Sequence, residues 1–314
     1  MKSSGRYFLG DGTMDYFIER EKQHIEEMLA KDRVTKREIQ RIITQAQAEI
    51  TQQINDLRKS LAGRENISVD ELLKQADKMD VELFSEKAKI YVQTKDFSPQ
   101  ANRELRLYNY KMKVSRLELI KTQLNLELTA MMNDIDKLVA SDLYNDAMSE
   151  FERQAGILKE TMPKSLRTQI TAIINGSYLD EEGKGGFVKF SSKLWGFKRV
   201  LQSELERLVT RATLAGQHPR VTAREIKRVF NVTTSQAVRL ARTESSRIQT
   251  EVQRRMFEKA KVKRYMIIGE PDACSKCTPY LGKVFRIDEW IYTPPFHPHC
   301  RCSVVALPDD YYPS

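Results

Sequence analysis

Apolar residues recur at helical spacing through much of the first half of the chain. Between Thr35 and Gly63 they fall three or four residues apart, which places them along one side of an α-helix. These positions are Ile39, Ile43, Ala46, Ile50, Ile54, Leu57 and Leu61. Thr35-Lys36-Arg37-Glu38 has the pattern of a capping box, and Gly63 suits a helix C-terminus. The pattern therefore predicts a long helix that buries one face.

Two further helices are predicted before residue 155. Ser68-Val69-Asp70-Glu71 is a second capping pattern, and Ser98-Pro99 places a cap residue before a proline suited to the first helical turn. A second apolar stripe consists of Leu124, Leu128, Met131, Ile135 and Leu138. Its alternating spacings of four and three are typical of a packed bundle or a coiled coil. The stripes are expected to form a core, and the alternative is that one also faces a partner helix.

Turn-forming residues interrupt this regular pattern between residues 156 and 196. Met162-Pro163, Asn175-Gly176 and Gly183-Lys184-Gly185-Gly186 are too closely spaced for continuous long helices. A length of 314 residues also fits two domains better than one. We therefore predict a helical domain over residues 1–155, a connecting segment over 156–196 and a second domain over 197–314.

Helices resume beyond this segment and then give way to short strands. Residues 194–216 and 234–260 are predicted helices, with a further capping box at Thr222-Ala223-Arg224-Glu225. Runs rich in strand-forming residues follow at 261–268, 283–287 and 303–307. The predicted fold is mainly α, with an elongated helical N-terminal domain followed by an α+β C-terminal domain that contains a small sheet.

All four cysteines and two of the four histidines lie in one stretch beside the predicted strands. The stretch begins with Cys274-Ser275-Lys276-Cys277 and ends with His297-Pro298-His299-Cys300-Arg301-Cys302. A two-residue gap lets both thiolates of a turn bind one tetrahedral ion, at Zn–S distances of about 2.3 Å. We predict bound Zn²⁺. The candidate ligands are Cys274, Cys277, His297, Cys300 and Cys302, with His299 as an alternative histidine.

The predicted metal site has the composition of a structural site. Soft ligands that fill the coordination shell leave no open position for water. Three short strands also offer little apolar area, a deficit that a metal would offset. The alternatives are reduced thiols without metal, or two disulfides. Because residues 1–12 contain no apolar segment of a signal peptide, we expect a reducing cytoplasm, which favours metal over disulfides. No run approaches the roughly 20 apolar residues of a membrane span, so no membrane partner is expected.

Positive charge is concentrated between residues 197 and 264. This stretch holds 17 Lys or Arg, 6 Glu and no Asp, a balance of +11, so the rest of the chain carries −2 of the total of +9. Such a block predicts a polyanion partner, and no base-reading motif accompanies it, so any binding of nucleic acid is expected to be independent of sequence. The candidate residues are Arg239, Arg242, Arg247, Arg254 and Arg255. The alternative for each is a solvated face with intrahelical pairs such as Glu244 with Arg247.

Several C-terminal motifs occur together in a known arrangement. They are Ala241-Arg242-Thr243-Glu244, Asp272, Cys274-x-x-Cys277, Gly282, Phe285 and Pro294-Pro295-x-His297-Pro298-x-Cys300-Arg301-Cys302. Over roughly residues 195–306 the chain resembles the C-terminal domain of the phage Mu F-like minor head proteins, also called head morphogenesis proteins of tailed bacteriophages. The resemblance favours His297 over His299 as a metal ligand.

The resemblance implies a low-copy structural protein inside the phage head, associated with the portal vertex. Its implied partners are the portal protein, the capsid and scaffold proteins, and double-stranded DNA during assembly, packaging or ejection. The implied location is the virion, after assembly in the bacterial host cytoplasm, and no enzymatic activity is implied. Two alternatives come from other classes. One is a zinc-dependent hydrolase such as a nuclease, which a cysteine-dominated cluster disfavours, and the other is a zinc-stabilised DNA-binding regulator.

Overall fold

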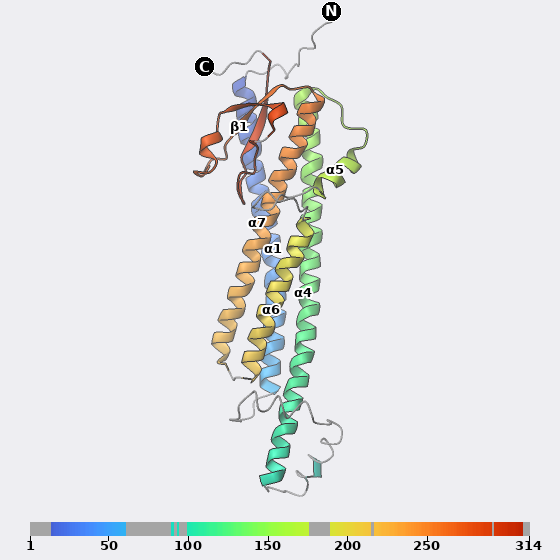
Figure 1. The fold of residues 1–314 in the computed structure, drawn as a ribbon, viewed down its shortest axis with the longest axis vertical. Coiled ribbons are helices and arrows are strands. Elements are labelled where there is room, and N and C mark those ends of the chain that lie inside the picture. The colour runs from blue at the N-terminus through green and yellow to red at the C-terminus, as the bar shows by residue number, and fades with distance from the viewer. Residues whose placement is uncertain are drawn as a thin grey trace, which may run out of the picture. The chain divides into compact units, whose positions relative to one another are not determined.

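The computed structural model describes residues 14–60, 89–90, 93, 99–175, 189–214, 217–290 and 292–309. Its α-helices are α1 (Met14–Ser60), α4 (Pro99–Leu158), α5 (Leu166–Ile174), α6 (Phe190–Leu214) and α7 (Pro219–Lys259) (Figure 1). Strands β1 (Arg264–Ile268), β2 (Val284–Arg286) and β3 (Ser303–Leu307) follow, with the short 3₁₀-helices η1 (Thr278–Tyr280) and η2 (Ile287–Glu289). This confirms a mainly α fold with a small C-terminal sheet. The helix predicted from Ser68 lies outside the described residues.

Helix α1 buries the predicted apolar stripe but begins much earlier than predicted. Ile39, Ile43, Ala46, Ile50 and Ile54 are all buried. The capping box at Thr35 was wrong as a helix start, because Thr35 lies within α1 and its Oγ1 donates a hydrogen bond to Asp142 Oδ2 of α4 at 2.6 Å. Buried Phe17 and Ile25 extend the apolar face upstream, interrupted by polar residues that also face the interior.

Helix α4 begins at Pro99, as the Ser98-Pro99 pair predicts, and ends at Leu158. The second predicted stripe is buried at Leu124, Leu128, Met131 and Ile135. Leu138 is half-buried and its neighbour Val139 is buried instead. The stripe is therefore a core face over most of its length.

Helix α7 is one continuous helix where the sequence predicted two starts. Pro219 occupies its first turn, and the Nδ1 atom of His218 accepts the backbone N–H of Arg220 at 3.2 Å, so the histidine caps the helix. Thr222 and Thr234 lie within the helix rather than at helix starts, and Thr222 is buried. The capping-box prediction at Thr222 was wrong because His218 supplies the cap four residues earlier.

The sheet has the order β2-β1-β3, and both pairs are antiparallel. Tyr265 pairs with Phe285 on one side and with Ala306 on the other. Side chains alternate between the two faces, so the central and last strands contribute to two different clusters.

Both faces of this small sheet are covered. One face packs against α1 and the end of α4, in a cluster of Phe17, Ile25, Ile157, Met266, Ile268, Val305 and Leu307. The other packs against the end of α7, in a cluster of Phe257, Ala260, Val262, Tyr265, Ile267, Val304 and Ala306. Helices far away in the sequence therefore supply the apolar area that three short strands lack by themselves, so a metal is not the only group that can offset this deficit.

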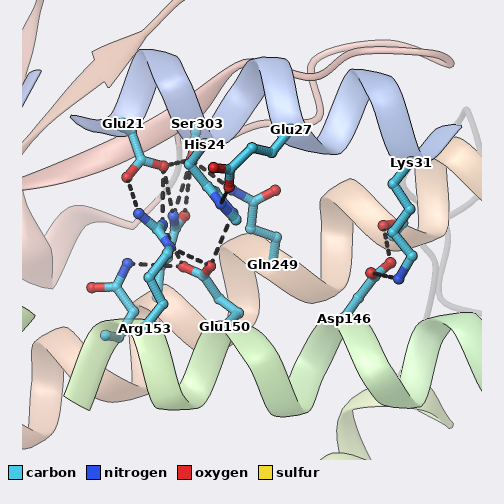
Figure 2. A network of polar contacts seen from close by, with 12 residues as sticks. Glu21, His24, Glu27, Lys31, Asp146, Glu150, Arg153, Gln249 and Ser303 are labelled. Atoms are coloured by element: carbon cyan, nitrogen blue, oxygen red, sulfur yellow. Dashed lines mark hydrogen bonds and ion pairs between the residues drawn. The ribbon is translucent and has the colours of Figure 1, made fainter. Parts of the chain in front are cut away.

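A buried polar network joins the sheet to three helices (Figure 2). Arg153 of α4 donates to Glu21 of α1 at 2.7 and 3.2 Å and to Glu150 at 2.7 and 2.8 Å. His24 Nε2 lies 3.2 Å from Glu150 Oε2, and the hydroxyl of Ser303 in β3 donates to Glu21 at 2.5 Å. Glu21 and Glu150 are each 2% exposed, so these charges depend on their protein partners rather than on water.

The described residues divide into two compact units. One combines residues up to 42, residues 133–197 and residues from 234 onward, and the other combines residues 43–132 and 198–233. Long helices contribute residues to both units, and the division of the chain at residues 155 and 196 stays a prediction from the sequence. Within the described part of the chain, none of the helices has the length and apolarity needed to cross a membrane.

Candidate metal centre

A compact turn after β1 positions the first two cysteines. The backbone N–H groups of Cys277 and Thr278 both donate to the carbonyl of Cys274, at 2.9 and 3.0 Å. Gly282 returns the chain to β2 with φ of +71°, a conformation that favours glycine, and its N–H donates to the Ile267 carbonyl at 2.9 Å. The turn thus holds the two thiols on one side of the loop.

The second Cys/His segment brings its sulfur and nitrogen atoms against this turn. His297 Nε2 lies 3.1 Å from both Cys274 Sγ and Cys277 Sγ. The Cys274–Cys277 and Cys277–Cys300 sulfur pairs are 3.9 and 3.7 Å apart. Ligands of a tetrahedral zinc ion lie roughly 3.5–3.8 Å from one another. The cluster has nearly these dimensions and could hold a metal ion.

The orientation of His297 fits a metal ligand. Its Nδ1 lies 2.7 Å from the Pro298 carbonyl oxygen, which can only accept, so Nδ1 carries the proton and donates. In the neutral imidazole with this tautomer, the lone pair of Nε2 faces two sulfurs. A carbonyl partner on the far ring nitrogen is the usual way in which a metal-binding histidine is oriented.

The cysteine thiols of the cluster differ in their pKa values. Burial raises the pKa of Cys277 to about 12, whereas a hydrogen bond with Cys302 lowers the pKa of Cys300 to about 6. Cys302 itself has a raised pKa because its thiol is hydrogen-bonded to Cys300 and buried. Several adjacent thiolates require a compensating cation, since like charges in a buried site oppose ionisation. A bound metal ion would supply that charge.

His299 occupies a different place from His297. It adopts φ of +71°, and its backbone N–H donates to Thr243 Oγ1 of α7 at 3.1 Å. Among the described residues, two of the three groups with metal-ligand spacing contain His297, and none contains His299. The left-handed backbone turns the two neighbouring histidines to different sides of the loop.

Residues of the Arg-Thr-Glu motif attach this loop to the helices. Arg242 of α7 donates to Glu270 Oε2 at 2.6 Å, and Glu270 Oε1 accepts the backbone N–H of Arg301 at 3.0 Å. The buried Arg301 guanidinium donates to Asp32 of α1 at 2.8 and 2.5 Å. Sequence reasoning missed Asp32 and Glu270, because isolated carboxylates carry no spacing signal.

Most of the arginines predicted to bind DNA are engaged within the protein. Arg247 pairs with Glu244 and donates to the Ile173 carbonyl. Arg254 pairs with Glu251 and Glu258, and Arg255 pairs with Glu251. Arg242 pairs with Glu270, as described above, and Arg239 is exposed. All five arginines lie on α7, and carboxylates of the protein pair with most of them.

A second group of cations on α7 is more exposed. Arg220, Arg224, Lys227 and Arg228 recur at intervals of four, three and one along the first half of the helix, and all four are exposed. Residues at i and i+4 lie on the same side of a helix. This spacing can be read from the sequence, but the helix start predicted at Thr222 separated Arg220 from the other three cations.

Residues 203–305 match a family model described as Phage Mu protein F like protein. No curated protein and no solved structure matches the chain. The matched segment runs from α6 to β3 and contains the whole Cys/His cluster. The match confirms the resemblance of the C-terminal region to this family.

Proposed function

We propose that the chain is a structural minor head protein of a tailed bacteriophage, carried inside the virion and associated with the portal and procapsid. The observation that carries this proposal is the family match over residues 203–305. The Cys/His cluster and the Arg242-Thr243-Glu244 segment lie within the matched residues and form one connected structure around the loop. The proposal includes no enzymatic activity. Glu270, the carboxylate nearest to His297 and Cys300, is bonded to Arg242 and Arg301 rather than free to act as a base.

The location can be tested in particles of the phage that encodes the chain. We expect mass spectrometry to detect the protein at low copy number in purified procapsids and in DNA-filled heads. In procapsids assembled without the portal protein, its amount relative to capsid protein should fall at least severalfold. Particles that lack the chain altogether would contradict the proposal, and an unchanged amount without portal would contradict portal association.

We further propose that the protein binds double-stranded DNA without sequence preference through exposed cations of α7. Arg220, Arg224, Lys227 and Arg228, which all belong to one compact unit, support this surface. Lys and Arg side chains that replace condensed counterions give salt-sensitive affinity, typically about 10⁻⁴ to 10⁻⁶ M near physiological salt for non-specific binding. Arg242 and Arg247 contribute less in this proposal, because their charges are paired.

Reversal of three exposed cations should weaken this binding. The variant Arg220→Glu/Arg224→Glu/Arg228→Glu is expected to bind DNA at least about tenfold more weakly and to reduce the salt slope by up to about three, one for each lost phosphate contact. Fluorescence anisotropy across a salt titration measures both quantities. The matched control is Lys22→Glu/Arg37→Glu/Arg41→Glu on α1, which changes the net charge equally. Equal losses in both variants would show that only net charge matters.

We propose Zn²⁺ as the resident metal, held by Cys274, Cys277, His297 and Cys300. The short contacts among these four groups support this set. Cys302 lies within 4.8 Å of Cys277 and Cys300 and is the competing fourth ligand. Three thiolates and one imidazole would close the coordination shell, so the ion would stabilise the loop rather than activate water.

A further inference from the structure

A cavity of about 250 Å³ lies beside the metal centre, within the compact unit that contains the sheet. Helices α1, α4 and α7 and the segment around His299 form its walls. Its polar lining consists of Lys31, Asp32, Arg33, Thr35, Lys36, Asp142, Asp146, Arg242, Ser245, His299 and Arg301. One ordered water needs only roughly 10–15 Å³, so the cavity has room for a larger polar ligand.

The three carboxylates of the cavity are already bonded to donors of the protein. Asp32 accepts two hydrogen bonds from the Arg301 guanidinium, and Asp142 accepts one from the Thr35 hydroxyl. Asp146 accepts from Lys31 and from Ser245. Asp32 and Asp146 therefore pair with cations of the wall, whereas Asp142 is bonded to a neutral hydroxyl.

Donors, in contrast, remain unused. Arg301 is 2% exposed, and its Nη1 has no hydrogen-bond partner. The Nε atom of Arg242 also lacks a hydrogen bond, although it lies 3.4 Å from Asp32 Oδ2. Among the lining residues that the structure describes, no buried side-chain acceptor is left without a partner. A buried guanidinium nitrogen without an acceptor is costly, so this wall favours a ligand that only accepts hydrogen bonds.

Two more cations border the cavity. Arg33 and Lys36 of α1 line it and are both exposed, which places positive charge where the cavity meets solvent. We propose that the cavity binds a phosphate-type oxyanion, with Arg301 and Arg242 as its inner donors and Arg33 and Lys36 at its mouth. Guanidinium groups suit this ligand because their planar donors match phosphate oxygens. The inference does not depend on the proposed function, because it rests on the unused donors and the cations of the cavity wall.

Calorimetric titration of the full chain with inorganic phosphate tests the site, in a buffer whose ionic strength is matched with sodium chloride. We expect saturable binding, and binding at least about tenfold weaker in Arg33→Ala/Lys36→Ala, since one charge-assisted hydrogen bond contributes about 1.5–3 kcal/mol. The control Lys22→Ala/Arg37→Ala removes two exposed cations of α1 outside the cavity and should bind phosphate normally. Arg301→Lys keeps the charge but removes the guanidinium, and it should abolish saturation. If that variant fails to fold, the Arg33/Lys36 pair decides the result.

A competition experiment identifies the source of the phosphate group. If the cavity takes a phosphate of the DNA backbone, inorganic phosphate will displace duplex DNA more strongly than chloride does at equal ionic strength. If it takes a free anion, phosphate will still bind while the affinity for DNA stays unchanged. Both results support the oxyanion site. Absence of saturable phosphate binding, or equal binding in the Arg33/Lys36 variant, overturns it.

Discussion

Replacement of Arg153 by methionine should lower the free energy of unfolding by about 3–5 kcal/mol, the usual cost of removing one partner from a buried ion pair. Arg153 makes four hydrogen bonds to Glu21 and Glu150, and both carboxylates are almost fully buried. Without the guanidinium, two negative charges remain close together in the interior between α1 and α4. Denaturant unfolding followed by circular dichroism measures the loss.

Two control variants test the origin of this loss of stability. They distinguish the cost of leaving buried carboxylates unpaired from the effect of removing one positive charge. Arg41→Met removes an exposed arginine that pairs with Glu38, and it should cost at most about 1 kcal/mol. The triple variant Glu21→Gln/Glu150→Gln/Arg153→Met removes the uncompensated charges together with the arginine. It should be more stable than Arg153→Met alone. If Arg153→Met cost no more than Arg41→Met, the network would not hold these elements together.

The same network predicts a loss of stability in acid. Burial by itself would raise the pKa of Glu150, but the charge of Arg153 and hydrogen bonds from His24 and Arg153 outweigh it and lower the pKa to about 2. A carboxyl with a depressed folded-state pKa contributes stability above its unfolded pKa of about 4.3 and loses that contribution as pH falls toward the folded value. Stability should therefore decline between about pH 4.3 and 2. The decline should be shallower in Glu150→Gln.

Removal of the metal is the second change with a large expected effect. The protein as purified should contain one zinc per chain, and Cys277→Ser should weaken metal affinity by more than about 100-fold, beyond the range expected for loss of an outer-shell partner. Cys277 is buried and lies close to both His297 and Cys300, so its loss removes a central ligand. Elemental analysis and competition with a chelator measure stoichiometry and affinity.

The packing around the sheet also predicts which parts of the protein lose protection from hydrogen exchange when a chelator removes the metal. Both faces of the sheet are covered by α1, α4 and α7, so the helical signal should persist and β1 and β3 should stay protected from hydrogen exchange. Protection should be lost mainly in the loops around Cys274 and Cys300. Cys302→Ser is the matched control and should retain the metal if Cys300 is the fourth ligand. Protein that as purified holds far less than one metal equivalent, yet protects the loops around Cys274 and Cys300 from hydrogen exchange, would contradict the site.

Some features of this protein follow from the sequence alone because they depend on neighbours along the chain. The stripes at Ile39–Ile54 and Leu124–Ile135 identify buried helix faces, since helical spacing places those residues on one side whatever they pack against. The strand 303–307 and the Cys-x-x-Cys turn are equally local. The family match over residues 203–305 likewise rests on sequence motifs.

Other features depended on contacts between residues far apart in sequence. Thr35 has the pattern of a helix cap, yet its hydroxyl bonds to Asp142, and α1 continues through it. The spacing of the arginines in α7 predicts a cationic face. In the structure, Glu270, Glu244 and Glu251 pair with most of these arginines. Tertiary packing decided these points because a polar side chain can cap, face solvent or join a buried network. Only its neighbours in space determine which of these it does.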